Sequence, residues 1–214
     1  EMARRVLQMA GNIFRFGVAI GQCVRNPAAD VRDALASPKP VKHRPSLKPG
    51  ELPEFMRRLA QYDGDEQTRL GLELVAHTMV RTSEVRFAHR DEFENLDMPQ
   101  ALWRIPAARM KMRRDHLVPL SPRAVDIVKR LLVLTGNKAL LFAADTSSGV
   151  ISENTLIYAV YRMGYHGRAS VHGLRSTAST ILNEHEFNRD WIEMQLAHSE
   201  GSVRSIYNAA EWIS

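Results

Sequence analysis

The chain has 214 residues, enough for one domain with a hydrophobic core and part of a second. It carries 29 Lys and Arg against 24 Asp and Glu, a net charge of +5 that favours an anionic partner. The charge alone would fit binding to nucleic acid, binding to a membrane surface, or solubility without any such partner. No apolar run approaches the roughly 20 residues of a membrane span, and a single Cys excludes an internal disulfide. We therefore expect a protein of the reducing cytoplasm without a membrane segment.

Two amphipathic segments open the chain. Apolar residues recur at helical spacing from residue 2 to about residue 25, where a proline ends the pattern, and a shorter helix is expected over residues 28–35. These two helices bury too little apolar surface to fold by themselves. We therefore expect residues 1–36 to be the end of a domain that begins before Glu1, and the chain to be a fragment.

Residues 37–49 are rich in proline and in basic side chains. Four prolines exclude both a helix interior and a central strand, and the charged residues keep the segment in solvent. The composition predicts an interdomain linker. Its basic residues, Lys39 and Lys42 among them, could lie along a phosphate backbone.

Two helices are predicted next, over about residues 49–62 and 66–80. Arg81 follows the second helix directly, at the edge of its apolar run. Two interpretations remain open for this residue. It forms an ion pair with Glu84 that closes the edge of the core, or its guanidinium binds an anion and Glu84 orients it from behind.

The helical period gives way to a β-hairpin between residues 93 and 120. Two strand-like runs, 102–105 and 116–120, flank a long tip, and five basic residues without an acid lie from Arg104 to Arg114. Such a concentration of like charge repels itself unless an anion is bound. The tip is therefore expected to clamp phosphate groups, through Arg109, Arg113 and Arg114.

Three further helices are predicted over residues 121–134, 152–163 and 171–185, with a brief buried strand at 140–142. In the last helix His172 and Arg175 are three residues apart and share one face. A guanidinium offers forked donors to phosphate oxygens, and an imidazole can donate a hydrogen bond or move a proton near neutral pH. The pair suits phosphoryl transfer, although one such motif alone is weak.

The pair is one of five motifs that occur in a fixed order. They are Arg81-Thr-Ser-Glu84, Lys111 at the hairpin tip, His172-Gly-Leu-Arg175, Leu196-Ala-His198, and Tyr207 nine residues later. In this order and spacing they resemble the catalytic domain of the tyrosine recombinases, in particular the phage-type integrases, over about residues 50–210. The resemblance implies a mainly α-helical fold with a small antiparallel β-sheet (α+β). It also implies a catalytic domain over residues 50–214 and the C-terminal helices of a core-binding domain over residues 1–36.

The resemblance also implies a role for each catalytic residue. The cations of Arg81 and Arg175 would meet the charge of the phosphate, and Tyr207 would be the nucleophile that forms a 3′-phosphotyrosine. His172 would accept a proton, His198 would donate to a nonbridging oxygen, and Lys111 would protonate the departing 5′ oxygen. No metal or other cofactor is expected. A zinc site of His172, His185 and His198 is the alternative, but no Cys pair or His-Glu-x-x-His spacing supports it.

The function that the resemblance implies is site-specific recombination of DNA, for integration or excision of a mobile element. Its expected partners are double-stranded DNA at attachment sites, a tetramer of the full-length protein and accessory DNA-bending proteins. The expected location is the cytoplasm, at the nucleoid. Two alternatives remain: strand relaxation of the type IB topoisomerase kind, whose phosphotyrosyl site is similar, and a DNA-binding protein that has lost catalysis.

Overall fold

The computed structural model describes residues 2–31, 34–35, 44–110 and 112–198. Contacts divide the chain into two units, Glu1–His43 and Arg44–Ser214. The last six residues of the predicted linker, 44–49, therefore belong to the second unit. Four residues singled out from the sequence lie outside the described ones: Lys39, Lys42, Lys111 and Tyr207.

The first unit contains helix α1 (Met2–Ala19) and the short 3-10 helix η1 (Pro27–Ala29). The helix predicted to reach residue 25 ends six residues earlier, because Gly21 has a positive φ of 73° and the amides that follow it turn back to the carbonyl of Gly17. The second predicted helix is represented by η1, whose start is capped by the side chain of Asn26.

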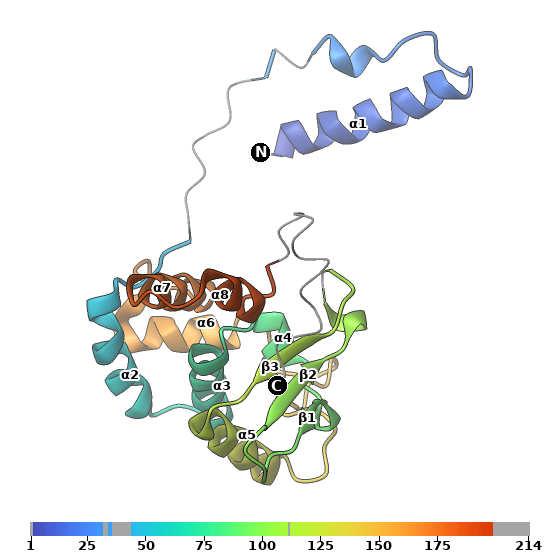
Figure 1. Cartoon of the computed structure of the whole chain (residues 1–214). Coiled ribbons are helices and arrows are strands. Elements are labelled where there is room, and N and C mark those ends of the chain that lie inside the picture. Colours follow the sequence, from blue (N-terminus) through green and yellow to red (C-terminus); the bar gives the residue numbers. More distant parts are fainter. Residues whose placement is uncertain (1, 32–33, 36–43, 111, 199–214) are drawn as a thin grey trace. The chain divides into compact units, whose positions relative to one another are not determined.

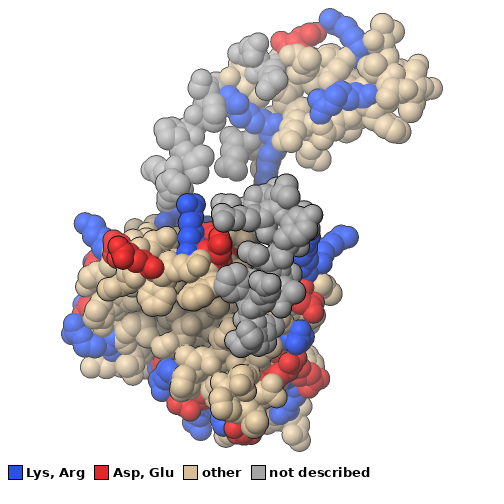
Figure 2. All heavy atoms as spheres, in the orientation of Figure 1, with Lys and Arg blue, Asp and Glu red and all other residues tan. Residues whose placement is uncertain are grey.

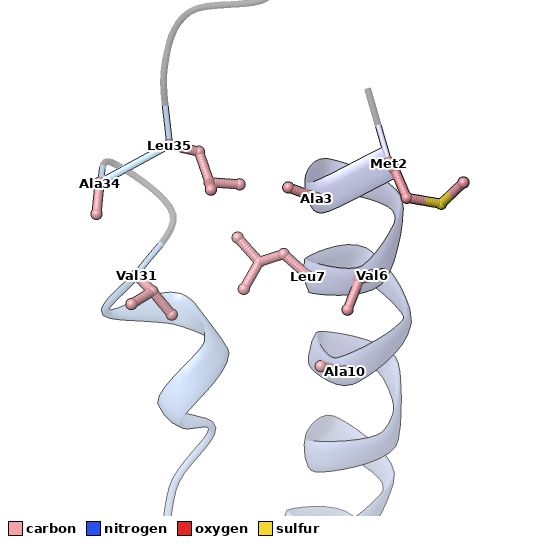
Figure 3. Close-up of a pocket in the computed structure, with 8 residues that line it drawn as sticks. All are labelled: Met2, Ala3, Val6, Leu7, Ala10, Val31, Ala34 and Leu35. Atoms are coloured by element: carbon pink, nitrogen blue, oxygen red, sulfur yellow. The ribbon is translucent and has the colours of Figure 1, made fainter.

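Helix α1 presents apolar side chains on more than one face. Leu7 points toward Leu35 across an apolar groove between α1 and the segment that follows η1 (Figure 3). Other large apolar side chains of the helix are exposed: Met2, Val6, Met9, Ile13 and Phe16. A helix with this much uncovered apolar surface does not form a closed core with η1. The prediction that residues 1–36 belong to a larger domain stays a prediction.

The second unit is built around helix α3 (Glu66–Thr78), which contacts most of the other helices (Figure 1). Its leucine and valine side chains are buried on nearly every face, as expected for a central helix. The helices around it are α2 (Leu52–Ala60), α4 (Thr82–Arg86), α5 (Pro122–Thr135), α6 (Thr155–Val160) and α7 (Val171–Glu184). Helix α8 (Arg189–Gln195) packs against α7. The shorter helical turns are η2 (Pro49–Glu51), η3 (Arg90–Glu92), η4 (Ala107–Arg109) and the π-helical turn η5 (Tyr161–Tyr165).

A three-stranded antiparallel sheet lies beside these helices. Its order is β1 (Phe93–Glu94), β2 (Leu102–Ile105) and β3 (His116–Pro119), and Trp103 of β2 pairs with Val118 of β3. Trp103 is fully buried, as alternation along the strand requires. The predicted hairpin is confirmed. The strand predicted at residues 140–142 is wrong: Leu141 and Phe142 are buried, but the segment makes one isolated bridge, between Leu140 and His89.

The predicted fold class is confirmed, since the described residues are mainly helical with one small antiparallel sheet. None of the helices within the described ranges is long and apolar enough to cross a membrane. On the visible face of the second unit, basic and acidic side chains are interspersed (Figure 2). The net charge of the chain therefore does not mark an anion site on that face, and the site has to be found from individual guanidinium groups.

Candidate active site

Arg175 is the most deeply buried cation of the predicted site. It lies in the first half of α7, and only 3% of the residue is exposed. Its guanidinium donates to two backbone carbonyls, that of Met79 after α3 and, at 2.6 Å, that of Leu196 after α8. Burial and the positive charge of Arg81 lower the pKa of Arg175 to about 10, and the charge of Glu84 opposes them. The guanidinium thus stays charged at neutral pH, and two carbonyls fix its position.

Arg81 stands at the N-terminus of α4 and forms the ion pair with Glu84 that the sequence left open. Its Nη1 lies 2.8 Å from Oε1 of Glu84, while the other carboxylate oxygen accepts the backbone N–H of Arg81 at 2.6 Å. Nη2 donates to the carbonyl of Ala197 at 3.2 Å. Glu84 is 3% exposed and the Arg81 side chain 27%. Glu84 therefore orients the guanidinium from the protein side while part of Arg81 stays open to solvent.

The two guanidinium groups hold one short turn between them. Leu196 and Ala197, whose carbonyls accept from Arg175 and Arg81, are consecutive residues at the end of α8. The chain reverses there because Ala197 has a φ of 48°, and Met79 ends α3 with a similar φ of 55°. A further hydrogen bond, from Gln195 to the carbonyl of Thr78 at 2.6 Å, joins the same two segments. Residues 78–81 and 195–198 therefore meet at the start of α7.

His198 is brought to this site by the turn. Its Nδ1 lies 2.9 Å from a carboxylate oxygen of Glu193, and its backbone N–H donates to the Glu193 carbonyl at 3.0 Å. A carboxylate on Nδ1 favours a proton on that nitrogen and fixes the orientation of the ring. The imidazole is about half exposed, so Nε2 is available to a ligand. Glu193 was not singled out from the sequence, because its pairing with His198 depends on the turn after α8.

His172 lies on the exposed side of α7, one turn before Arg175. Partial burial lowers the pKa of His172, and nearby positive charges lower it further, in the order Arg175, Arg44 and Arg81. The ring is therefore neutral at neutral pH and can accept a proton. The effect of Arg44 on this ring was not expected, since the sequence places that residue in the predicted linker.

The basic residues of the hairpin divide into two groups. Arg113 and Arg114 are exposed and make no ion pair within the described residues. Arg104 instead pairs with Glu94 at 2.7 Å. The expected mutual repulsion of the hairpin is thus partly relieved by acids that precede it in the sequence.

Arg109, expected to clamp a phosphate, has partners within the protein. Its guanidinium donates to Glu92 and to the backbone carbonyl of Glu84, and its side chain is 20% exposed. Glu92 in turn accepts the indole N–H of Trp103 at 2.9 Å. Arg109 therefore ties the hairpin to α4 and so supports Arg81. The sequence could not show this, because the acid stands 17 positions earlier in the chain.

His116 is a buried titratable residue that the sequence did not mark as functional. It opens β3, is 6% exposed, and neither ring nitrogen has a hydrogen-bond partner of normal geometry within the described residues. Burial lowers its pKa; the charge of Glu84 and the backbone of Met194 oppose this, and Arg175 and Arg81 add to it. A neutral imidazole thus packs among the groups that hold the guanidinium pair.

Four of the six predicted catalytic residues lie among the described residues, and the structure brings them to one region: Arg81, His172, Arg175 and His198. Within the described part of the chain, no group of three or more His, Cys, Asp or Glu side chains could hold a metal ion. The arrangement offers two fixed cations, one neutral imidazole and one carboxylate-bound imidazole. Such a set can bind a phosphate group and move a proton beside it.

The sequence model described as the Phage integrase family matches residues 45–212. This chain belongs to the phage integrase family. The integrase of Enterobacteria phage P4 is 40% identical over 224 residues, which cover 97% of this chain and 50% of that protein. The prophage integrase IntZ of Escherichia coli strain K12 is 35% identical over 214 residues, covering 100% of this chain and 52% of that protein. The family predicted from the motifs is confirmed, and the chain spans about half the length of these curated relatives.

Solved structures of the family share the fold. A lambda integrase (75–356) dimer bound to a COC′ core site has a TM-score of 0.66 at 18% identity, over 98% of this chain and 75% of that one. The XerH site-specific recombinase bound to difH substrate, a pre-cleavage complex, has a TM-score of 0.60 at 19% identity, over 76% of this chain and 49% of that one. At such identities the likeness establishes the architecture, while the roles of individual residues remain predictions.

Proposed function

We propose that this chain carries the catalytic apparatus of a site-specific DNA recombinase. The enzyme would cleave and rejoin DNA strands through a 3′-phosphotyrosine, for integration or excision of a mobile element. The observation that supports this best is that Arg175 and Arg81 are fixed by the carbonyls of two consecutive residues, directly before His198. The transition state of phosphoryl transfer spreads negative charge over nonbridging oxygens, and cations held in place before the reaction stabilise it without reorganising.

Tyr207 is the proposed nucleophile. Its phenolic oxygen forms a bond to phosphorus, the bond from phosphorus to the 5′ oxygen breaks, and the phenolic proton passes to the neutral ring of His172. Lys111 gives a proton to the departing 5′ oxygen, and rejoining reverses each transfer. The roles of Tyr207 and Lys111 rest on the family motif, because both lie outside the described residues.

The remaining groups bind and orient the phosphate. Arg81 and Arg175 donate to nonbridging oxygens, and the planar fork of each guanidinium suits two oxygens at once. His198 binds a nonbridging oxygen through Nε2, since Glu193 occupies its Nδ1. It donates from Nε2 when both ring nitrogens carry a proton. Each step uses only side chains of this chain, so we expect the reaction to proceed in the presence of a chelator.

We propose double-stranded DNA at attachment sites as the substrate and a tetramer of the full-length protein as the acting assembly. Among the structural relatives, a lambda integrase tetramer is bound to a Holliday junction. Accessory DNA-bending proteins and action at the nucleoid, in the cytoplasm, belong to the same proposal. Strand relaxation of the type IB topoisomerase kind and DNA binding without catalysis gain no support from the family match or from these relatives.

The proposal is tested with a nicked duplex that loses a short strand on cleavage and so traps the covalent intermediate. We expect an adduct that survives denaturation in chelator, with the nucleotide attached to Tyr207 by mass spectrometry. Tyr207→Phe should form no adduct while DNA binding stays within about twofold, because only the nucleophilic oxygen is removed. Attachment to another residue, or a strict need for a divalent ion, would contradict the proposal.

A further inference from the structure

The segment from Arg44 to Lys48, called here the α7 strap, crosses the first turns of the helix that carries His172 and Arg175. Two hydroxyl groups of α7 and its cap bind its backbone. Ser170 donates to the carbonyl of Pro45 at 2.9 Å, and Thr177 donates to the carbonyl of Leu47 at 2.8 Å. Leu47 itself is 3% exposed and belongs to the main core. The strap is therefore fixed to α7 at two points about two helical turns apart.

Gly173 is what allows the strap to lie so close. A Cβ atom at this position would stand 2.1 Å from the carbonyl oxygen of Pro45 and 2.9 Å from Cα of Ser46. Both are backbone atoms, which cannot rotate away as the end of a side chain can. Glycine inside a helix costs about 1 kcal/mol relative to alanine. That cost is offset here by the close contact with the strap, which no larger residue permits. Gly173 itself lies between His172 and Arg175 in the sequence.

The strap begins with a cation that acts on the candidate active site. Arg44 is exposed, makes no ion pair within the described residues, and lies close enough for its charge to lower the pKa of His172. The same ring feels Arg175 and Arg81. Three positive charges therefore act on one imidazole, and Arg44 is the exposed one, free to meet an anion from solvent.

We propose that the α7 strap is a positioning element of the recombination reaction and that it holds Arg44 beside His172 as a further phosphate-binding residue. The proposal rests on the proposed function, because the phosphate is that of the DNA substrate. Arg44 supplies a charge-assisted contact to the DNA backbone next to the scissile phosphate. The contact depends on Gly173, since any side chain there displaces Pro45 and Ser46 and moves Arg44 with them.

The test compares Arg44→Gln and Gly173→Ala with two matched controls. Arg57→Gln removes an exposed arginine of α2, and Gly50→Ala adds a Cβ that would meet nothing within 4 Å. Binding of a duplex is titrated at several salt concentrations, and covalent adduct formation is timed over a range of pH. We expect Arg44→Gln to reduce the log–log salt slope by about 0.9 and to slow adduct formation about tenfold. The acid side of its pH profile should move to higher pH, because His172 loses a positive neighbour.

Gly173→Ala should reproduce the changes of Arg44→Gln, and the double variant should add little to the salt effect. The controls should match the unaltered chain. Wild-type salt dependence in Gly173→Ala, or equal behaviour of Arg44→Gln and Arg57→Gln, would overturn the proposal. If Gly173→Ala does not fold, Arg44→Gln alone decides. If no adduct forms at all, the proposed function fails, while the salt slopes still report whether Arg44 contacts phosphate.

Discussion

Two basic regions of this protein differ in how their charges are held. Arg175 and Arg81 donate to backbone carbonyls and to the buried Glu84, so each guanidinium has a fixed position before any ligand arrives. Arg113 and Arg114 at the hairpin tip are exposed and make no ion pair within the described residues. Both regions carry two arginines, but only the first region is built into the packing of four helices, α3, α4, α7 and α8.

The difference separates two uses of arginine on a phosphate. A fixed guanidinium in a water-poor setting stabilises a charged transition state strongly, because it does not have to reorganise. An exposed arginine is hydrated and mobile and contributes mainly by releasing counterions from DNA. We therefore expect the first region to govern the rate of chemistry and the stability of the fold, and the second to govern salt-dependent binding.

The largest expected effect comes from Arg175→Lys. An ammonium group cannot reach the carbonyls of Met79 and Leu196 and a phosphate together, so covalent adduct formation should slow by about 10²-fold or more. The free energy of unfolding, from urea titration, should fall by about 1–3 kcal/mol, because a buried carbonyl loses its donor.

The matched control is Arg114→Lys, the same substitution at an exposed position. It should change adduct formation less than about twofold and leave the urea midpoint unchanged. If the two substitutions had equal effects, the fixed arginines at the candidate active site would not differ in function from the solvated arginines of the hairpin tip.

A smaller effect concerns the acid stability of the guanidinium region. Burial lowers the pKa of His116, so below about pH 6.5 the unfolded chain takes up a proton that the folded chain refuses. The free energy of unfolding should therefore decrease as the pH is lowered below about 6.5. This residue contributes up to about 1.4 kcal/mol per pH unit to that decrease. His116→Phe should weaken this dependence, measured as the unfolding free energy at pH 7.5 and 5.5.

His185→Phe, at an exposed position at the end of α7, is the control for loss of a histidine. It should leave the pH dependence of stability as it is. An unchanged pH dependence in His116→Phe would show that the buried ring does not contribute to acid sensitivity.

The smallest effect on chemistry is expected from replacing Arg113 and Arg114 together by Ala. The log–log slope of DNA affinity against salt should become shallower by about 1.8, equally for related and unrelated duplexes, since phosphate contacts carry no sequence information. The cleavage rate of saturated complexes should stay within about threefold.

Arg109→Ala is the informative contrast. It should leave the salt slope nearly unchanged and lower the free energy of unfolding, because the partners of Arg109 are Glu92 and Glu84. If Arg109→Ala made the log–log salt slope clearly shallower, Arg109 would contact phosphate after all.

Local patterns predicted well where local forces decide. The helix predicted from residue 171 begins there, capped by Ser170, whose hydroxyl accepts the N–H of Gly173 at 2.9 Å. The hairpin strands lie where the period changes to two. The errors occur where turns or contacts between distant segments override the local pattern. Gly21 ends α1 early, and the buried run at 140–142 packs in the core without pairing as a strand.

The sequence by itself determined the family, the fold class and the identity of the candidate catalytic residues, because the order and spacing of reactive side chains are carried along the chain. Only the tertiary structure decided how those side chains are held. The acceptors of Met79, Leu196 and Ala197 are backbone carbonyls, which every residue type has, so no sequence motif could predict them. The same holds for the α7 strap, whose approach to Gly173 joins residues more than 120 positions apart. Contacts of this kind arise from packing, in which distant segments meet through backbone atoms that every residue shares.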